Sequence, residues 1–132
     1  MKQYAIYVND TVCPFVGQIL SGEKKIETRM RDDLKGVVKA AKSEWIAVIQ
    51  VHTPFEPLVV GYIKLAAGFK FDKNAVNVRE MARITGTPYD VKEDGCKYGY
   101  VIEDVKSCDP YFVPFNKEKH GRHWTAWEER GY

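Results

Sequence analysis

Three charged side chains of complementary types stand within six positions of one another, at Lys24, Glu27 and Arg29. A lysine and an arginine can hold a phosphate group or a carbonyl oxygen. A carboxylate beside them can accept hydrogen bonds from N–H donors. The same residues can also form a ladder of surface ion pairs, which would contribute under about 1 kcal/mol to stability. The residue types therefore admit a binding cleft, and the elements around them decide whether they meet.

These residues are predicted to lie just after a short helix and within the short strand that follows it. The pattern predicts a helix over Thr11–Ser21 that ends at Gly22. One face of this helix carries the apolar side chains of Phe15, Val16, Ile19 and Leu20. The next segment, Lys25–Arg29, is predicted to be a strand, so Glu27 and Arg29 would share one face about 7 Å apart. The lysine at position 24 would approach from the end of the helix, and the three side chains would surround one small area.

The rest of the chain is predicted to contain more strand than helix. Strands are expected at Tyr4–Val8, Trp45–Val51, Leu58–Leu65 and Tyr98–Val105, with an extended edge segment at Tyr111–Phe115. A second helix is expected at Asn77–Ile84 and a loop at His52–Pro57, while the tail, His120–Tyr132, fits either a strand or a helical turn. Gly61, inside an apolar strand, indicates a bulge or a close backbone approach. These elements favour an α+β, mostly β fold, a small barrel with helices at its ends.

The composition is that of one ordinary globular domain, covering residues 1–132. Hydrophobic residues make up 45% and charged residues 29% of the chain, which excludes low-complexity disorder, collagen and coiled coil. No window reaches the ~20 consecutive apolar residues of a membrane span. The N-terminal segment has too short an apolar run for a signal peptide. We therefore expect a cytoplasmic protein that does not associate with membranes.

Charge is nearly balanced overall but unevenly distributed. The formal net charge is +2, from 20 basic and 18 acidic residues. The window 24–42 holds seven basic and three acidic residues and so carries a charge of +4. Such a region on a near-neutral body can be an electrostatic footprint for phosphates. A solvated surface stretch is the alternative.

The three cysteines, Cys13, Cys96 and Cys108, are expected to stay reduced, because cytosolic thiols seldom pair. A zinc site is conceivable from the last two together with His120 and His123, but these cysteines stand 12 apart rather than two to four. A Cys–His nucleophilic pair has no better support, since any three cysteines and three histidines offer such pairings. We expect no metal and no cofactor.

The segment Gly22-x-Lys24-x-x-Glu27-x-Arg29 resembles the G-x-K-x-x-E-x-R signature of ASCH domains, which belong to the PUA-like superfamily. Val59–Ile63 is similar to the V-G-x-[IV] strand of that family, and the late strand, its prolines and the tryptophan-containing C-terminus also agree. The resemblance covers nearly the whole chain. It implies a PUA-like pseudo-barrel of five to six mixed strands with short helices at its openings.

The resemblance also implies a basic cleft beside the barrel, lined by the three signature side chains, and RNA or a nucleoside or nucleotide as the partner. An aromatic ring would stack on the base, and the candidates are Tyr62, Trp124 and Trp127. The tail segment His120–Trp124 adds Arg122, which suits a contact with phosphate. Burial in the core is the alternative for these aromatics. The sequence leaves the oligomeric state open.

Hydrolysis is the main alternative that the resemblance leaves open. Some ASCH proteins resemble amidohydrolases that remove acyl groups from N4 of cytidine, with a G-x-K-x-x-T-x-R motif whose threonine is the nucleophile and whose lysine is the base. Lys24 matches that lysine, but Glu27 stands in the threonine's place, and a carboxylate is a poor replacement for an alcohol nucleophile. Thr28 is adjacent, but in a strand it would point to the opposite face. The assisting glutamate of these enzymes has no clear match.

Two further enzymatic routes use the same residues. Glu27 could act as a general base on a water molecule, with Lys24 and Arg29 stabilising an oxyanion. A metal-independent ribonuclease, which has been proposed for an ASCH protein, would need similar groups. Lys24 and Glu27 are therefore the catalytic candidates if the chain is an enzyme. A small protein-binding adaptor is a third class, which nothing in the sequence favours.

Overall fold

The computed structural model describes residues 2–9, 14–51, 57–70, 98–113, 118–119 and 123–129. Within these ranges the chain forms eight strands and two short helices. The strands are β1 (Lys2–Asn9), β2 (Ile26–Arg29), β3 (Ile46–Val51), β4 (Leu58–Leu65), β5 (Phe69–Lys70), β6 (Tyr98–Phe112), β7 (Glu118–Lys119) and β8 (Trp124–Glu128). The helices are α1 (Phe15–Leu20) and α2 (Lys35–Ala41). The predicted α+β, mostly β class is confirmed.

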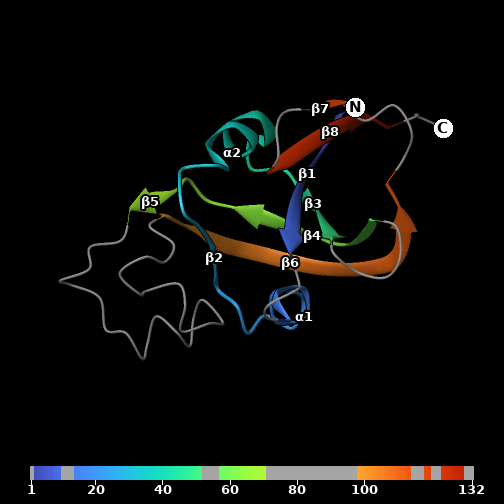
Figure 1. The fold of residues 1–132 in the computed structure, drawn as a ribbon, viewed down its shortest axis with the longest axis horizontal. Coiled ribbons are helices and arrows are strands. Elements are labelled where there is room, and N and C mark those ends of the chain that lie inside the picture. The colour runs from blue at the N-terminus through green and yellow to red at the C-terminus, as the bar shows by residue number, and fades with distance from the viewer. Residues whose placement is uncertain are drawn as a thin grey trace.

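The strands pair into one mixed sheet in the order β2-β6-β4-β3-β1-β8-β7, and β5 also pairs with β6. The pair β1–β3 is parallel, and the other pairs are antiparallel. The long strand β6 connects the two parts of the sheet, because residues 98–101 pair with β2 and residues 102–112 pair with β4 (Figure 1). Among the described residues no pairing joins β2 to β7, so the sheet is open.

Side chains of the central strands alternate between two cores, as expected for strands covered on both faces. Ile6 and Val8 of β1 face the larger core, whereas Ala5 faces the smaller one together with Ala47, Ile49, Val59 and Trp127. Both helices pack against the larger core, α1 through Val16 and Ile19 and α2 through Val37 and Ala41. Figure 1 shows the two helices near opposite ends of β1. In the described part of the chain, neither helix has the length and apolar content needed to cross a membrane.

Several predicted elements differ from the observed ones in number or extent. The predicted segment Tyr98–Val105 and the first two residues of the predicted segment Tyr111–Phe115 belong to the single strand β6, and the tail contributes strand β8, which pairs with β1. The helix α2 was not predicted, although Leu34, Val37, Val38 and Ala41 recur at helical spacing. The predicted helix Asn77–Ile84 and most of the predicted loop at 52–57 lie outside the described residues.

The end of α1 matches the prediction. Gly22 adopts a φ of +81°, the left-handed conformation that glycine takes without steric cost. Its N–H donates to the carbonyl oxygen of Ile19 at 3.1 Å, and the N–H of Lys24 donates to the carbonyl oxygen of Gln18 at 2.9 Å. These bonds fix the turn that leads from α1 into β2. They therefore fix where the signature segment begins relative to the helix.

Gly61 lies where the backbone comes closest to its neighbours, as the sequence indicated. The register between β4 and β6 shifts between Val59 and Gly61. A Cβ atom at this position would lie 2.5 Å from Cδ2 of Leu20 and 2.7 Å from the carbonyl oxygen of Lys106. Because the carbonyl of Lys106 belongs to the β6 backbone, the close approach of β4 and β6 at this point requires glycine.

The buried Tyr100 hydroxyl joins β6 to the segment between β2 and α2. It donates a hydrogen bond to Oδ1 of Asp32 and accepts one at 3.1 Å from the N–H of Leu34. Burial, and then the hydrogen bond to Asp32, raise the pKa of Tyr100 above its ordinary value of 10.0. Burial also raises the pKa values of Tyr62 and Tyr111, whose hydroxyl groups lie 2.6 Å apart.

The raised pKa values of these three tyrosines predict that the folded chain loses stability in alkaline solution. Below pH 10 both the folded and the unfolded chain hold the phenol protons, so stability is independent of these groups. Above pH 10 the unfolded chain releases the protons while the folded chain retains them, so the free energy of unfolding falls by up to about 1.4 kcal/mol per pH unit for each tyrosine. Urea unfolding at pH 8 to 11 measures this slope. Tyr100→Phe should make it shallower, and an unchanged slope in that variant would contradict the assignment.

Candidate ligand-binding site

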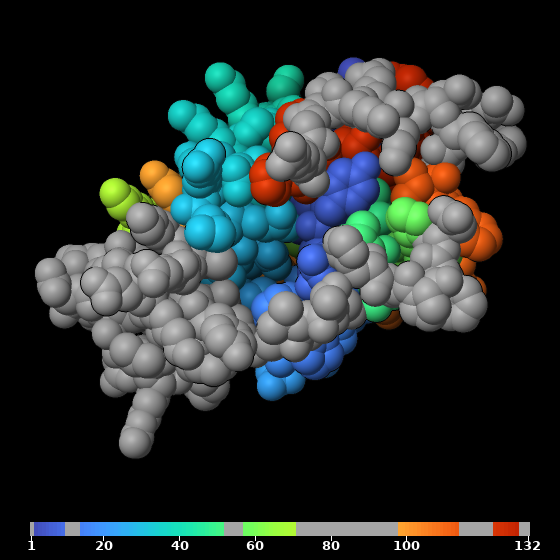
Figure 2. Space-filling view, viewed as in Figure 1, coloured from blue at the N-terminus to red at the C-terminus, as the bar shows by residue number. Residues whose placement is uncertain are grey.

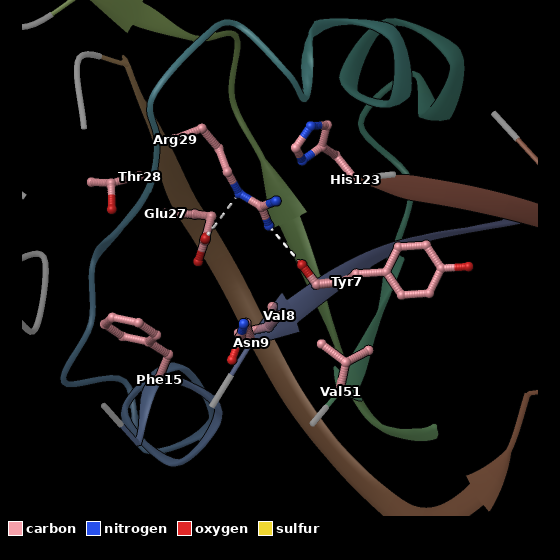
Figure 3. Close-up of a pocket in the computed structure, with 9 residues that line it drawn as sticks. All are labelled: Tyr7, Val8, Asn9, Phe15, Glu27, Thr28, Arg29, Val51 and His123. Atoms are coloured by element: carbon pink, nitrogen blue, oxygen red, sulfur yellow. Dashed lines mark hydrogen bonds and ion pairs between the residues drawn. The ribbon is translucent and has the colours of Figure 1, made fainter. Parts of the chain in front are cut away.

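A pocket of about 320 Å³ lies beside the C-terminal end of β1 and the last three residues of β2 (Figure 3). It is lined by residues from β1, α1, β2, β3 and the start of the last described segment: Tyr7, Val8, Asn9, Phe15, Glu27, Thr28, Arg29, Val51 and His123. Two of the three signature residues, Glu27 and Arg29, therefore lie in one cavity. This volume is at the lower end of the range for small-molecule sites.

Glu27 is the most unusual group in this pocket, because it is a carboxylate with only 5% of its surface exposed. Nε of Arg29 lies 3.3 Å from Oε1 of Glu27, as a hydrogen bond and an ion pair. The other oxygen, Oε2, is buried and has no hydrogen-bond partner in the described structure. Figure 3 shows it directed away from Arg29, toward the side where Phe15 and Asn9 lie. Since buried polar atoms are nearly always satisfied, this oxygen is a natural acceptor for a ligand.

Arg29 is fixed by two elements. Besides its bond to Glu27, its Nη2 donates to the carbonyl oxygen of Tyr7 at 2.8 Å. Tyr7 belongs to β1, although three strands separate β1 from β2 in the order of the sheet. The sheet therefore curls so that β2 returns toward β1, and the pocket lies in the space between them. A guanidinium held at two points keeps its remaining donors in a defined direction.

Lys24 is not among the residues that line the pocket. Its side chain is 2% exposed, and its ammonium nitrogen lies 4.9 Å from the centroid of the Phe15 ring, over the ring face. Phe15 in turn lines the pocket. Lys24 therefore contacts one lining residue of the pocket through a cation–π interaction.

His123 occupies the opposite side of the pocket from Phe15 (Figure 3). Its Nε2 lies 3.6 Å from Oδ1 of Asp33, and its side chain is half-exposed. Its carbonyl oxygen accepts a hydrogen bond at 3.0 Å from the N–H of Tyr7. This imidazole belongs to the tail motif that the sequence singled out, and it is the part of that motif that the described structure brings to Glu27 and Arg29.

Other residues that the sequence proposed lie elsewhere. Tyr62 lines a different pocket, at the other end of β1. Trp124 is half-buried and packs against Gly36 of α2 and, with ring centroids 6.2 Å apart, against Tyr4. Trp127 is 2% exposed and belongs to the smaller core. Arg122 lies outside the described residues.

The aromatic ring in the pocket lining comes instead from Phe15, which the sequence did not propose as a ligand contact. Tyr7 contributes its carbonyl oxygen, which accepts from Arg29, while its ring points away from Glu27 and Arg29 and packs against the smaller core (Figure 3). Phe15 carried a signal, since it was predicted on the apolar face of the helix that leads into the signature. Tyr7 carried none, because its place beside Arg29 depends on how the sheet curls.

The structure brings together only some of the residues that the hydrolase alternative needs. Thr28 lines the same pocket but lies on the other side of β2 from Glu27 and Arg29 (Figure 3), as alternation along a strand requires. Glu27 is therefore the acidic group of the pocket, and Thr28 is not presented beside it.

The basic window 24–42 is divided between the interior and the surface. Lys24 is buried and Arg29 is 14% exposed. The other five basic residues are exposed: Lys25, Arg31, Lys35, Lys39 and Lys42. Figure 2 shows side chains of the α2 segment projecting into solvent at one end of the molecule. This surface adds positive potential at α2.

In the part of the chain that the structure describes, no cluster of three or more His, Cys, Asp or Glu side chains could hold a metal ion. Two of the conceivable zinc ligands, Cys96 and His120, lie outside these ranges. A scan against protein-family models and a search of curated proteins find no match for this chain. The mostly β class is established by the structure, and the resemblance to ASCH domains stays a prediction carried by the motif.

Proposed function

We propose that this chain binds RNA or a nucleotide and accepts one nucleobase in the pocket between β1 and β2. The observation that carries the proposal is the buried Oε2 atom of Glu27, which has no hydrogen-bond partner in the described structure. A carboxylate can only accept hydrogen bonds, so its complement is an N–H donor. The exocyclic amines of cytosine, adenine and guanine are such donors.

The surroundings of Glu27 suit a base rather than a simple amine. The ring of Phe15 lines the pocket and offers a flat apolar wall against which a base can pack. Arg29 and His123 lie in the same lining and can meet a phosphate or a ring carbonyl. The volume of about 320 Å³ suits one nucleoside.

The predicted family supports the same assignment, because Glu27 and Arg29 are two residues of the signature that resembles that of ASCH domains. In this proposal Arg29 orients the carboxylate, and Lys24 contacts the Phe15 ring. The curl of the sheet joins β2 to β1 and closes the pocket around the ligand.

The test is a binding panel on the purified chain. Mononucleotides and a short single-stranded RNA are titrated at several salt concentrations, and N4-acetylcytidine is incubated with the chain and analysed for cytidine. We expect saturable binding that weakens as salt rises, since phosphate contacts release counterions, and no cytidine.

Two results would overturn this proposal. Absence of binding to every nucleotide and RNA would remove the function. Release of cytidine that disappears in Lys24→Met would instead make the chain an amidohydrolase. Methionine keeps the length of the buried side chain, so this variant is expected to fold.

A further inference from the structure

A second pocket lies at the other end of β1 and β3 from the Glu27 site. Its volume is about 650 Å³, and its lining combines lysines and aromatic rings. The lysines are Lys2, Lys42 and Lys106, and the rings are Tyr4, Trp45 and Tyr62. Two carboxylates, Glu44 and Glu129, also lie in the lining. We call this pocket the Trp45 groove.

Two ammonium groups converge on the Trp45 ring. Nζ of Lys106 lies 4.3 Å from the ring centroid, and Nζ of Lys64 lies 4.9 Å from it. The two charges therefore lie within about 9 Å of each other, which is comparable to the Debye length of about 8 Å at physiological salt. Like charges at this separation repel, and an anion held by both would relieve the repulsion.

The sheet itself sets this arrangement. Tyr62 and Lys106 are direct partners in the β4–β6 ladder, and Nζ of Lys106 lies 5.3 Å from the centroid of the Tyr62 ring. Lys64 is two residues after Tyr62 in β4 and so shares its face. The Tyr62 hydroxyl is fixed at 2.6 Å from that of Tyr111. Strands thus place Tyr62, Lys64 and Lys106, and Trp45 directly precedes β3.

We propose that the Trp45 groove is a second contact for single-stranded RNA, in which Lys106 and the neighbouring Lys64, both held against the Trp45 ring, bind a backbone phosphate. Positively charged grooves are a usual means of holding single strands. This inference rests on the proposed function for the class of its ligand. It adds that the preferred ligand is a strand of several nucleotides rather than a free nucleotide.

The distance between the two pockets explains why length matters. Tyr7 and Val51 line the Glu27 pocket, whereas Tyr4 and Trp45 line the Trp45 groove. The six-residue step from position 45 to 51 along β3 corresponds to about 20 Å of strand. One nucleotide cannot contact both pockets, but an oligonucleotide can.

The test compares a mononucleotide with single-stranded RNAs of increasing length, on the wild type and on Lys106→Gln. For the longest RNA we expect Lys106→Gln to weaken binding roughly threefold to tenfold and to reduce the salt dependence by about one phosphate contact. Mononucleotide affinity should not change. Lys70→Gln is the matched control, because it removes an exposed lysine from β5, outside the groove.

The outcomes separate the two proposals. Equal RNA affinity of Lys106→Gln and wild type, with mononucleotide binding intact, would overturn the second contact and leave the Glu27 site standing. Affinity that does not rise with RNA length would overturn it as well. If the wild type binds neither mononucleotide nor RNA, both proposals are wrong. Trp45→Leu provides a second variant, which should lose affinity for RNA while retaining affinity for the mononucleotide.

Discussion

Replacing Glu27 by glutamine is expected to weaken nucleotide binding by about tenfold to a hundredfold. A hydrogen bond to a charged group contributes about 1.5–3 kcal/mol, and this range corresponds to that loss of affinity. Glutamine has nearly the same shape, but it cannot form the ion pair with Arg29 that the carboxylate forms at 3.3 Å. Where its amide nitrogen takes the place of Oε2, it also presents a donor to the ligand's amine. Titration calorimetry with mononucleotides measures the effect.

The matched control is Glu23→Gln. It removes the same charge four positions earlier in the chain, from an exposed side chain outside the pocket lining. We expect its affinity to stay within about twofold of the wild type, since single exposed charges contribute little. Thermal unfolding of both variants checks that they fold. Wild-type affinity in folded Glu27→Gln would show that the unpartnered oxygen is not the acceptor of the ligand.

The strands of this fold could be predicted well because their signal is local. The apolar run Leu58–Leu65 coincides with β4. A glycine inside such a run indicates a bulge or a close backbone approach, and Gly61 lies at such a point. The helix α2 was missed because it is only seven residues long and contains a glycine and two β-branched valines, which lower its helix propensity. Its N-terminal end depends instead on Tyr100, 66 positions away from Leu34.

The candidate site could be predicted only in part, because a local pattern does not show which distant strands come together. Glu27 and Arg29 share a face of β2 because side chains alternate along a strand, and this rule needs no knowledge of the fold. The bond from Arg29 to the carbonyl oxygen of Tyr7 needs the curl of the sheet, which arises because β6 pairs with β2 at one end and β4 at the other. The sequence proposed Tyr62 as a ligand contact beside the signature on residue type alone. Strand β4 instead places Tyr62 in the lining of the Trp45 groove.

Gly61→Ala is expected to lower the free energy of unfolding by about 3 kcal/mol, at the upper end of the usual cost of overpacking. The added methyl group would lie 2.5 Å from Cδ2 of Leu20 and 2.7 Å from the carbonyl oxygen of Lys106. The leucine side chain can turn away, but the carbonyl belongs to the β4–β6 ladder and cannot move without loss of strand pairing. Urea unfolding followed by circular dichroism measures the change.

Gly17→Ala is the matched control, since it makes the same substitution in α1, where a Cβ would have no neighbour within 4 Å. Alanine is favoured over glycine inside a helix by up to about 1 kcal/mol, so this variant should be as stable as the wild type or more stable. Equal stability of the two variants would mean that the β6 backbone does not lie this close to Gly61.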